Sequence, residues 1–174
     1  MPSHAPEPSG APLAQAALPQ AYVEGLRDAW EGELFGDLLL RGLAETLNLP
    51  EERRAILRTL ADIEVAMAER LEPLVAGLVP ADVRAGAPGR AAARAAATLA
   101  DLPDMAAVLA RGAVSLPAAL ERFEALLADA PQDHRAAIDL LVAHEVCLID
   151  TYATDDVAEQ ERLVGAMMGR LGIG

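Results

Sequence analysis

The sequence is poor in cysteine and in aromatic residues. Cys147 is the only cysteine among 174 residues, so no disulfide can form within the chain. A single cysteine is typical of a reducing compartment, and we expect the protein in the cytoplasm. Aromatic side chains make up 3% of the residues, and valine, isoleucine and threonine are sparse beside alanine and leucine. This balance favours helix over sheet and predicts an all-α fold.

The features of membrane-spanning, secreted and nucleotide-binding chains are also missing. No apolar run reaches the roughly 18 residues that a membrane-spanning helix needs. The first 20 residues lack lysine and arginine and are rich in proline, which argues against a signal peptide and predicts a flexible tail over residues 1–18. No glycine-rich phosphate-binding motif occurs. A net charge of −13 argues against partners that are nucleic acids or anionic membrane surfaces.

Residues 19–174 are predicted to form one helical domain that begins with a hairpin. Apolar residues three and four positions apart predict a helix from Tyr22 to Leu47, with Glu33 in the middle of its apolar stripe. A second helix is predicted over residues 51–77, and Glu64 stands alone in its apolar stripe. The link between the two helices is short, so they are expected to pack antiparallel.

The second half of the chain predicts a further pair of main helices. Residues 77–102 read as a long connection with a short helix near 89–100, and another short helix is predicted over residues 103–111. Ser115 is the expected N-cap of a helix ending near Pro131, and Pro131 is expected to open the helix that contains Glu145. A last helix is expected from about Asp155 to residue 170. The whole predicts an antiparallel four-helix bundle with extra short helices.

Three carboxylates interrupt three apolar stripes at similar depth. Glu33 lies 15 residues before Asn48, and Glu64 lies 14 residues after Pro50, so both are about 21 Å from the same end of their hairpin. Glu145 also falls near the middle of its helix. Burying an unpaired carboxylate costs several kcal/mol, so these groups either reach solvent or an arginine, or they share a bound cation. Asp37 is expected at the edge of its stripe.

The residues around these acids resemble the ferritin-like superfamily, most closely its small and largely uncharacterised bacterial members. Two helical hairpins joined by a long connection match its layout over roughly residues 20–153. The resemblance implies a bundle that holds two iron or manganese ions, with ligands from four helices, two of them through Glu-x-x-His. The residues that support it are Trp30 and Glu33 in AWEGELFG, Glu64 in LADIEVAMAERLEPL, and His144 and Glu145 in LVAHEVCLID.

The sequence departs from this superfamily at both Glu-x-x-His motifs. Met67 follows Glu64 by three residues, and Leu148 follows Glu145 by three, where the resemblance would require histidines. The remaining candidate ligands are Glu33, Glu64, Glu145 and His144. They are consistent with a single-metal site or with a bundle that keeps residual acids without metal.

Three kinds of function are consistent with this pattern. The first is a metal-binding ferritin-like protein, an oxidoreductase or oxygenase that activates dioxygen or peroxide at carboxylate-bound iron or manganese. Glu33, Glu64 and Glu145 would be its ligands, and His144 would bind the metal or orient a ligand. The second is a non-catalytic bundle that has lost the metal and serves partner binding or self-association. The third is a binder of a small apolar ligand between helices.

A homodimer is expected from apolar residues that lie off the main stripes. Leu34, Leu38 and Leu39 on the first predicted helix are examples. One four-helix core cannot accommodate them all, so part of the excess is expected to form an apolar patch that a second copy covers.

Overall fold

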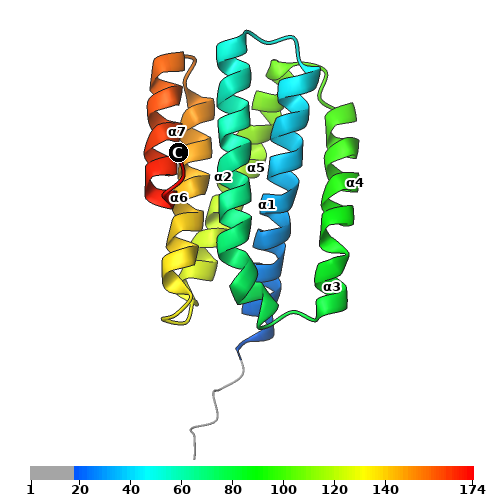
Figure 1. The fold of residues 1–174 in the computed structure, drawn as a ribbon, viewed down its shortest axis with the longest axis vertical. Coiled ribbons are helices and arrows are strands. Elements are labelled where there is room, and N and C mark those ends of the chain that lie inside the picture. The colour runs from blue at the N-terminus through cyan, green and yellow to red at the C-terminus, as the bar shows by residue number, and fades with distance from the viewer. Residues whose placement is uncertain (1–17) are drawn as a thin grey trace, which may run out of the picture.

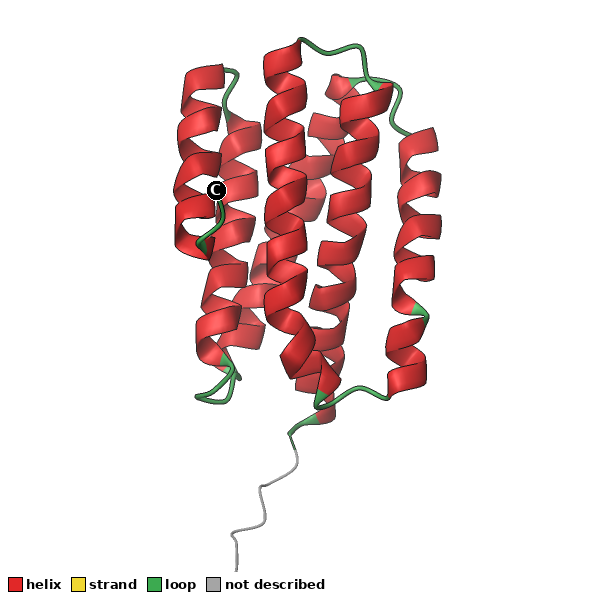
Figure 2. Ribbon diagram, in the orientation of Figure 1, coloured by secondary structure: helices red, strands yellow, loops and turns green. Residues whose placement is uncertain are grey.

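The computed structural model describes residues 18–174, and every regular element within them is a helix (Figures 1 and 2). The all-α prediction is therefore confirmed, whereas the predicted tail over residues 1–18 falls almost wholly outside the described part. The helices are α1 (Gln20–Thr46), α2 (Glu51–Ala76), α3 (Ala81–Ala85), α4 (Ala87–Ala100), α5 (Met105–Ala128), α6 (Arg135–Ala153) and α7 (Val157–Leu171).

The predicted hairpin of α1 and α2 is confirmed. The two helices run antiparallel and pack along their whole length, joined by residues 47–50 (Figure 1). Pro50 precedes α2, and Glu51 and Glu52 occupy its first turn, where their charge favours the positive end of the helix dipole. Pro73 lies inside α2 without ending it.

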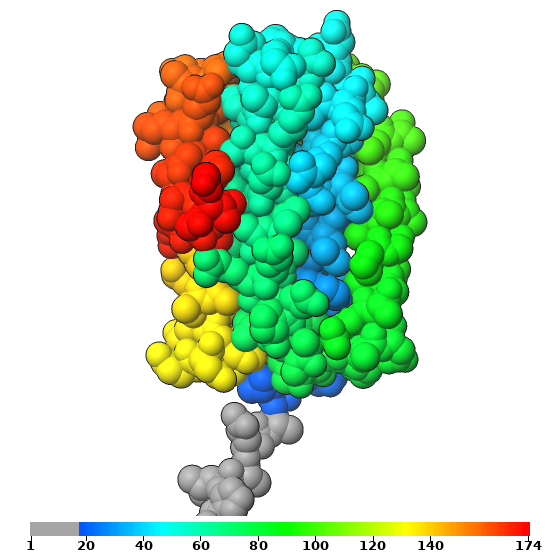
Figure 3. All heavy atoms as spheres, viewed as in Figure 1, coloured from blue at the N-terminus to red at the C-terminus, as the bar shows by residue number. Residues whose placement is uncertain are grey.

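The connection after α2 is more helical than the sequence predicted. It forms the short α3 and then α4, which packs along the side of α1 (Figure 3). Small residues make up the buried face of α4, and a Cβ at Gly42 of α1 would collide with the side chain of Leu99. The close approach of these helices therefore depends on the absence of a side chain at Gly42.

The prediction of two separate helices between residues 103 and 131 was wrong. A single helix, α5, begins after Asp104, whose side chain accepts a hydrogen bond from the backbone N–H of Ala107. Ser115 lies inside this helix and does not cap it. Gly112 packs against the ring of Tyr152 on α6, where a Cβ would approach to 3.2 Å. The helix continues through Pro117, which lacks a backbone N–H and so gives up one helix hydrogen bond.

The two C-terminal helices differ from prediction only at their starts. Residues 131–134 form a turn, so α6 begins at Arg135 and not at Pro131. Asp156 caps α7 by accepting a hydrogen bond from the backbone N–H of Ala158. Gly172 ends α7 in the left-handed region with φ 72°, which favours glycine. No helix in residues 18–174 is long and apolar enough to cross a bilayer.

The longer helices pack side by side around one hydrophobic interior. α1 packs on α2, α5 packs on α6, and α2 also contacts α6 (Figure 1). α4 lies outside α1, and α7 lies outside α2 and α6 (Figure 3). α1 and α5 are the least closely packed neighbours around this interior, and an open cavity lies between them.

Candidate metal centre

Three helices bring a polar side chain to one point in the interior. Glu33 from α1, Glu64 from α2 and His144 from α6 are 3%, 5% and 0% exposed. One ligand atom from each lies within 4.8 Å of the others. The heights predicted from the first hairpin are therefore correct for Glu33 and Glu64. We call Glu33, Glu64 and His144 the central group.

The spacing of the central group fits a bound cation. The His144 Nε2 atom lies 3.3 Å from Glu64 Oε1 and 3.5 Å from Glu33 Oε2. Metal–ligand bonds of about 2.0–2.2 Å that meet at about 90–110° place ligand atoms about 2.8–3.6 Å apart. Both distances lie inside this range, so the two contacts have the spacing of ligands around one ion.

Several atoms of this region have no hydrogen-bond partner within the described residues. They are Glu33 Oε2, both ring nitrogens of His144, and Glu145 Oε1. The contacts of His144 with the two carboxyls are close but lack the direction of a hydrogen bond. Buried polar atoms are rarely left unpaired, because each costs about 1–3 kcal/mol. A cation would satisfy the carboxyl oxygens and one imidazole nitrogen together.

Burial raises the pKa of the three carboxyl groups. Loss of hydration is the largest cause for Glu33, whose pKa stands well above its usual value, and the adjacent Glu64 raises it further. Burial likewise raises the pKa of Glu64 to about 8, against the effect of a hydrogen bond with Glu33. The pKa of Glu145 rises to about 7 through burial, with His144 and Arg122 opposing the rise. The metal-free group therefore retains protons near neutral pH.

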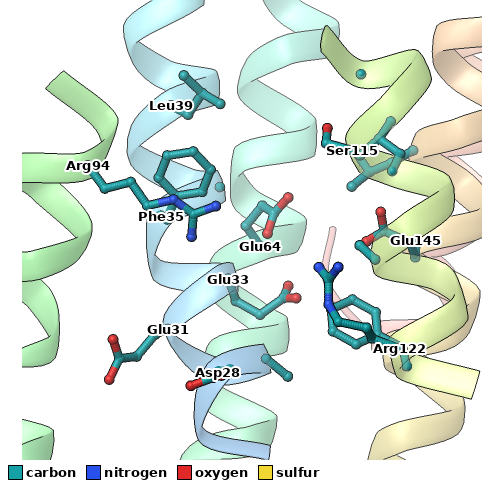
Figure 4. A pocket seen from close by; sticks show the side chains of 18 of the residues that line it. Asp28, Glu31, Glu33, Phe35, Leu39, Glu64, Arg94, Ser115, Arg122 and Glu145 are labelled. Atoms are coloured by element: carbon teal, nitrogen blue, oxygen red, sulfur yellow. The ribbon is translucent and has the colours of Figure 1, made fainter. Parts of the chain in front are cut away.

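Glu145 lies beside the central group and not within it. It is 4% exposed, and it faces the same cavity as Glu33 and Glu64 (Figure 4). Consecutive helix residues point about 100° apart, so His144 and Glu145 project in different directions from α6. His144 meets the two carboxyls, while Glu145 faces the side where α5 supplies Ser115 and Arg122 (Figure 4).

α5 contributes no carboxylate to this site. Ser115 and Arg122 are its polar residues nearest the acids in Figure 4, and Glu121 and Glu124 are exposed. Asp37 pairs with Arg41 at 2.6 Å, in line with its predicted position at a stripe edge. The histidine positions of the two expected Glu-x-x-His motifs hold the buried apolar residues Met67 and Leu148. The ligand set is thus smaller than the ferritin-like resemblance implies.

Gly36 is a site residue that the sequence reading missed. It lies almost one turn after Glu33 on α1, and a Cβ built on it would collide with the Glu64 carboxylate. The missing side chain therefore makes room for that carboxylate beside α1. The only sequence signal was a glycine inside a helix, a position that usually costs about 1 kcal/mol relative to alanine.

Replacing Gly36 with alanine is expected to displace Glu64 and to weaken both stability and cation binding. We expect Gly36→Ala to be about 1–3 kcal/mol less stable than Gly32→Ala, because added atoms strain a packed interior. Gly32→Ala is a matched control on the same helix, since its Cβ would meet no atom within 4 Å. Urea unfolding of both variants measures the difference. Equal stabilities would contradict the assigned role of Gly36.

Comparison with known proteins returns no relative: no protein-family model, no curated protein and no solved structure matches this chain.

Proposed function

We propose that this chain is a ferritin-like four-helix bundle that binds one iron or manganese ion through Glu33, Glu64 and His144 and acts in redox or oxygen chemistry. The observation that supports it is the central group, whose three side chains come from three helices, are buried, and lie at ligand spacing. α1, α2, α5 and α6 are the bundle helices of this proposal, and α4 and α7 are additions to it.

The ligand atoms of the central group suit iron or manganese better than metal ions that prefer sulfur ligands. Two carboxylates and one imidazole provide two hard oxygens and a nitrogen, which are ligands that Mn²⁺ and Fe²⁺ accept. The single thiol, Cys147, contacts Thr151 and the backbone of Leu163 and takes no part in the group. Three protein ligands leave coordination positions free, and the bound metal would supply redox chemistry there. Glu145 faces the same cavity, where it can hold a proton beside the metal site.

Metal analysis tests this proposal directly. Protein purified without chelator, or stripped and then titrated with Mn²⁺ or anaerobic Fe²⁺, is expected to bind one ion per chain. Glu33→Gln is expected to lower the affinity at least about tenfold, because it removes a charged ligand. Asp37→Asn is the control on the same helix, since Asp37 pairs with Arg41 outside the group. An absence of metal after loading, or equal affinities in both variants, would contradict the proposal.

A non-catalytic bundle is the second candidate. It is favoured by Met67 and Leu148, which fill the expected histidine positions, and by the absence of a carboxylate from α5 at the site. Its function would be self-association as a homodimer in the cytoplasm. Leu34 and Leu39 are partly buried, but large apolar side chains remain exposed on α1, α5 and α6 in the described part: Leu38, Leu109, Val114 and Val146. Sedimentation at several concentrations tests the dimer.

A further inference from the structure

The cavity between α1 and α5 is large enough for a substrate. Its volume is about 810 Å³, within the range of sites for small organic molecules. Small residues on both helices leave this space, and a Cβ at Gly32 would meet no atom within 4 Å. Glu33, Glu64 and Glu145 line its inner side (Figure 4). We call this cavity the α1–α5 groove.

Most of the wall of the α1–α5 groove is apolar. Leucines, a valine and aromatic rings are among the residues that line it. The ring of Phe35 lies under the guanidinium of Arg94, at 3.9 Å. A ligand in this groove therefore needs an apolar body. The aliphatic lining residues include Leu39, Leu43, Leu102, Val108 and Leu116.

The arginines of the α1–α5 groove are unusual in so acidic a chain. The protein has 14 arginines and no lysine against 27 acids, and most arginines pair with an acid or a backbone carbonyl. Within residues 18–174, four have no such polar partner: Arg94, Arg111, Arg122 and Arg135. The first three line the groove. Unpaired cations thus gather around one cavity.

The acids at the mouth of the groove pair with other arginines. Asp28 pairs with Arg27, and Glu31 pairs with Arg90. Asp129 also lines the groove, but it lies about 10 Å further along α5 than Arg122. The guanidinium of the exposed Arg122 points into the groove beside Glu145 (Figure 4). Arg122 lowers the pKa of Glu145, but the two side chains form no salt bridge in the described structure.

We infer that the α1–α5 groove binds an organic carboxylate with an apolar body. The carboxylate contacts Arg122, because a guanidinium binds carboxylates through two parallel hydrogen bonds. The apolar body extends past Glu64 towards Leu39 and Leu116. This arrangement places the carbon chain beside the central group. That such an acid is the substrate rests on the proposed function, whereas its binding needs no metal.

Calorimetry on metal-stripped protein with octanoate, octanol and acetate tests this inference. Octanoate is expected to bind at least about tenfold more tightly than octanol, which lacks the charge, and than acetate, which lacks the apolar body. Arg122→Gln is expected to lower the octanoate affinity about tenfold and to leave octanol binding unchanged. Arg135→Gln is the control, because Arg135 is equally unpaired but lies outside the groove.

A second variant tests whether octanoate binds in the α1–α5 groove. Gly32→Leu places a side chain in the open groove and is expected to abolish octanoate binding, while circular dichroism stays unchanged. Octanoate binding that survives Gly32→Leu, that is unchanged by Arg122→Gln, or that does not exceed octanol binding would overturn the inference. Octanoate binding is measured on metal-free protein and does not depend on the metal titration. If octanoate binds but the protein takes up no metal in that titration, only the proposed function is contradicted. Metal uptake without octanoate binding would contradict only the groove.

Discussion

Glu64→Gln is expected to stabilise the metal-free protein by about 1–4 kcal/mol and to destabilise the metal-loaded protein. In the metal-free state, Glu64 is buried, and its charged form is disfavoured by burial and by the charge of Glu145, although a hydrogen bond with Glu33 opposes the rise in its pKa. At neutral pH the Glu64 carboxyl must therefore take up a proton when the chain folds, and a neutral glutamine of the same shape removes this cost. Urea unfolding in the presence of a chelator measures the gain.

With saturating Mn²⁺ the sign reverses. Mn²⁺ at 1,000 times its dissociation constant stabilises the unmodified protein by about 4.1 kcal/mol, which exceeds the gain expected in the metal-free state. Glu64→Gln loses this term because it removes a ligand. Asp62→Asn is the matched control on α2, since Asp62 is exposed and pairs with Arg41. Exposed pairs contribute about 0–1 kcal/mol, so the control is expected to change little in either state. A Glu64→Gln effect below that of the control in both states would mean that Glu64 has no role in a site.

The height of the carboxylates was predictable because it depends on few quantities. The rise of an α-helix is fixed, and the link between α1 and α2 is short, so counting from residues 47–50 places Glu33 and Glu64 at one level. The predicted position of Glu145 near the middle of its helix also agrees with the structure. α6 begins four residues later than predicted, and Glu145 still lies in its middle. Counting residues along the helix did not predict which side chains Glu145 would contact.

The burial of both His144 and Glu145 was not predictable from one apolar stripe. A helix that packs on one side buries only one of two consecutive residues, because they point about 100° apart. α6 contacts α2, α5 and α7, so more than one of its faces is buried. Which faces are covered depends on the position of α7, and the sequence pattern of α6 does not contain that information.

The continuous α5 and the groove depend on packing between helices. Gly112, Ser115 and Pro117 are local signals for a break, but α5 is continuous through all three and packs along α6. The α1–α5 groove exists because α1 and α5 stand apart, and a periodic pattern defines faces without defining the distance between helices. The sequence therefore does not indicate that the exposed Arg122 borders a cavity, or that Gly36 leaves room for a carboxylate.

The metal-free protein is expected to lose stability as the pH rises from about 5 to about 8.5. Burial raises the pKa of Glu64 to about 8 and that of Glu145 to about 7, and raises that of Glu33 as well. Between 4.5 and these values the folded state binds more protons than the unfolded state. The free energy of unfolding therefore falls with rising pH across this window, by an amount on the order of a few kcal/mol. Thermal unfolding with chelator at pH 5.5 and pH 8.5 measures the difference.

Bound metal is expected to reverse this slope. A cation binds deprotonated carboxylates, so its stabilising effect grows as protons leave Glu33 and Glu64. With excess Mn²⁺ the melting temperature should rise from pH 5.5 towards pH 8, where the metal-free protein shows a fall. The double variant Glu33→Gln/Glu64→Gln separates the site from the general repulsion of a chain with net charge −13. Repulsion affects both proteins alike, whereas only the unmodified protein should respond to Mn²⁺. If the melting temperature changes equally with pH in both proteins, the pH dependence comes from the surface charge and not from the site.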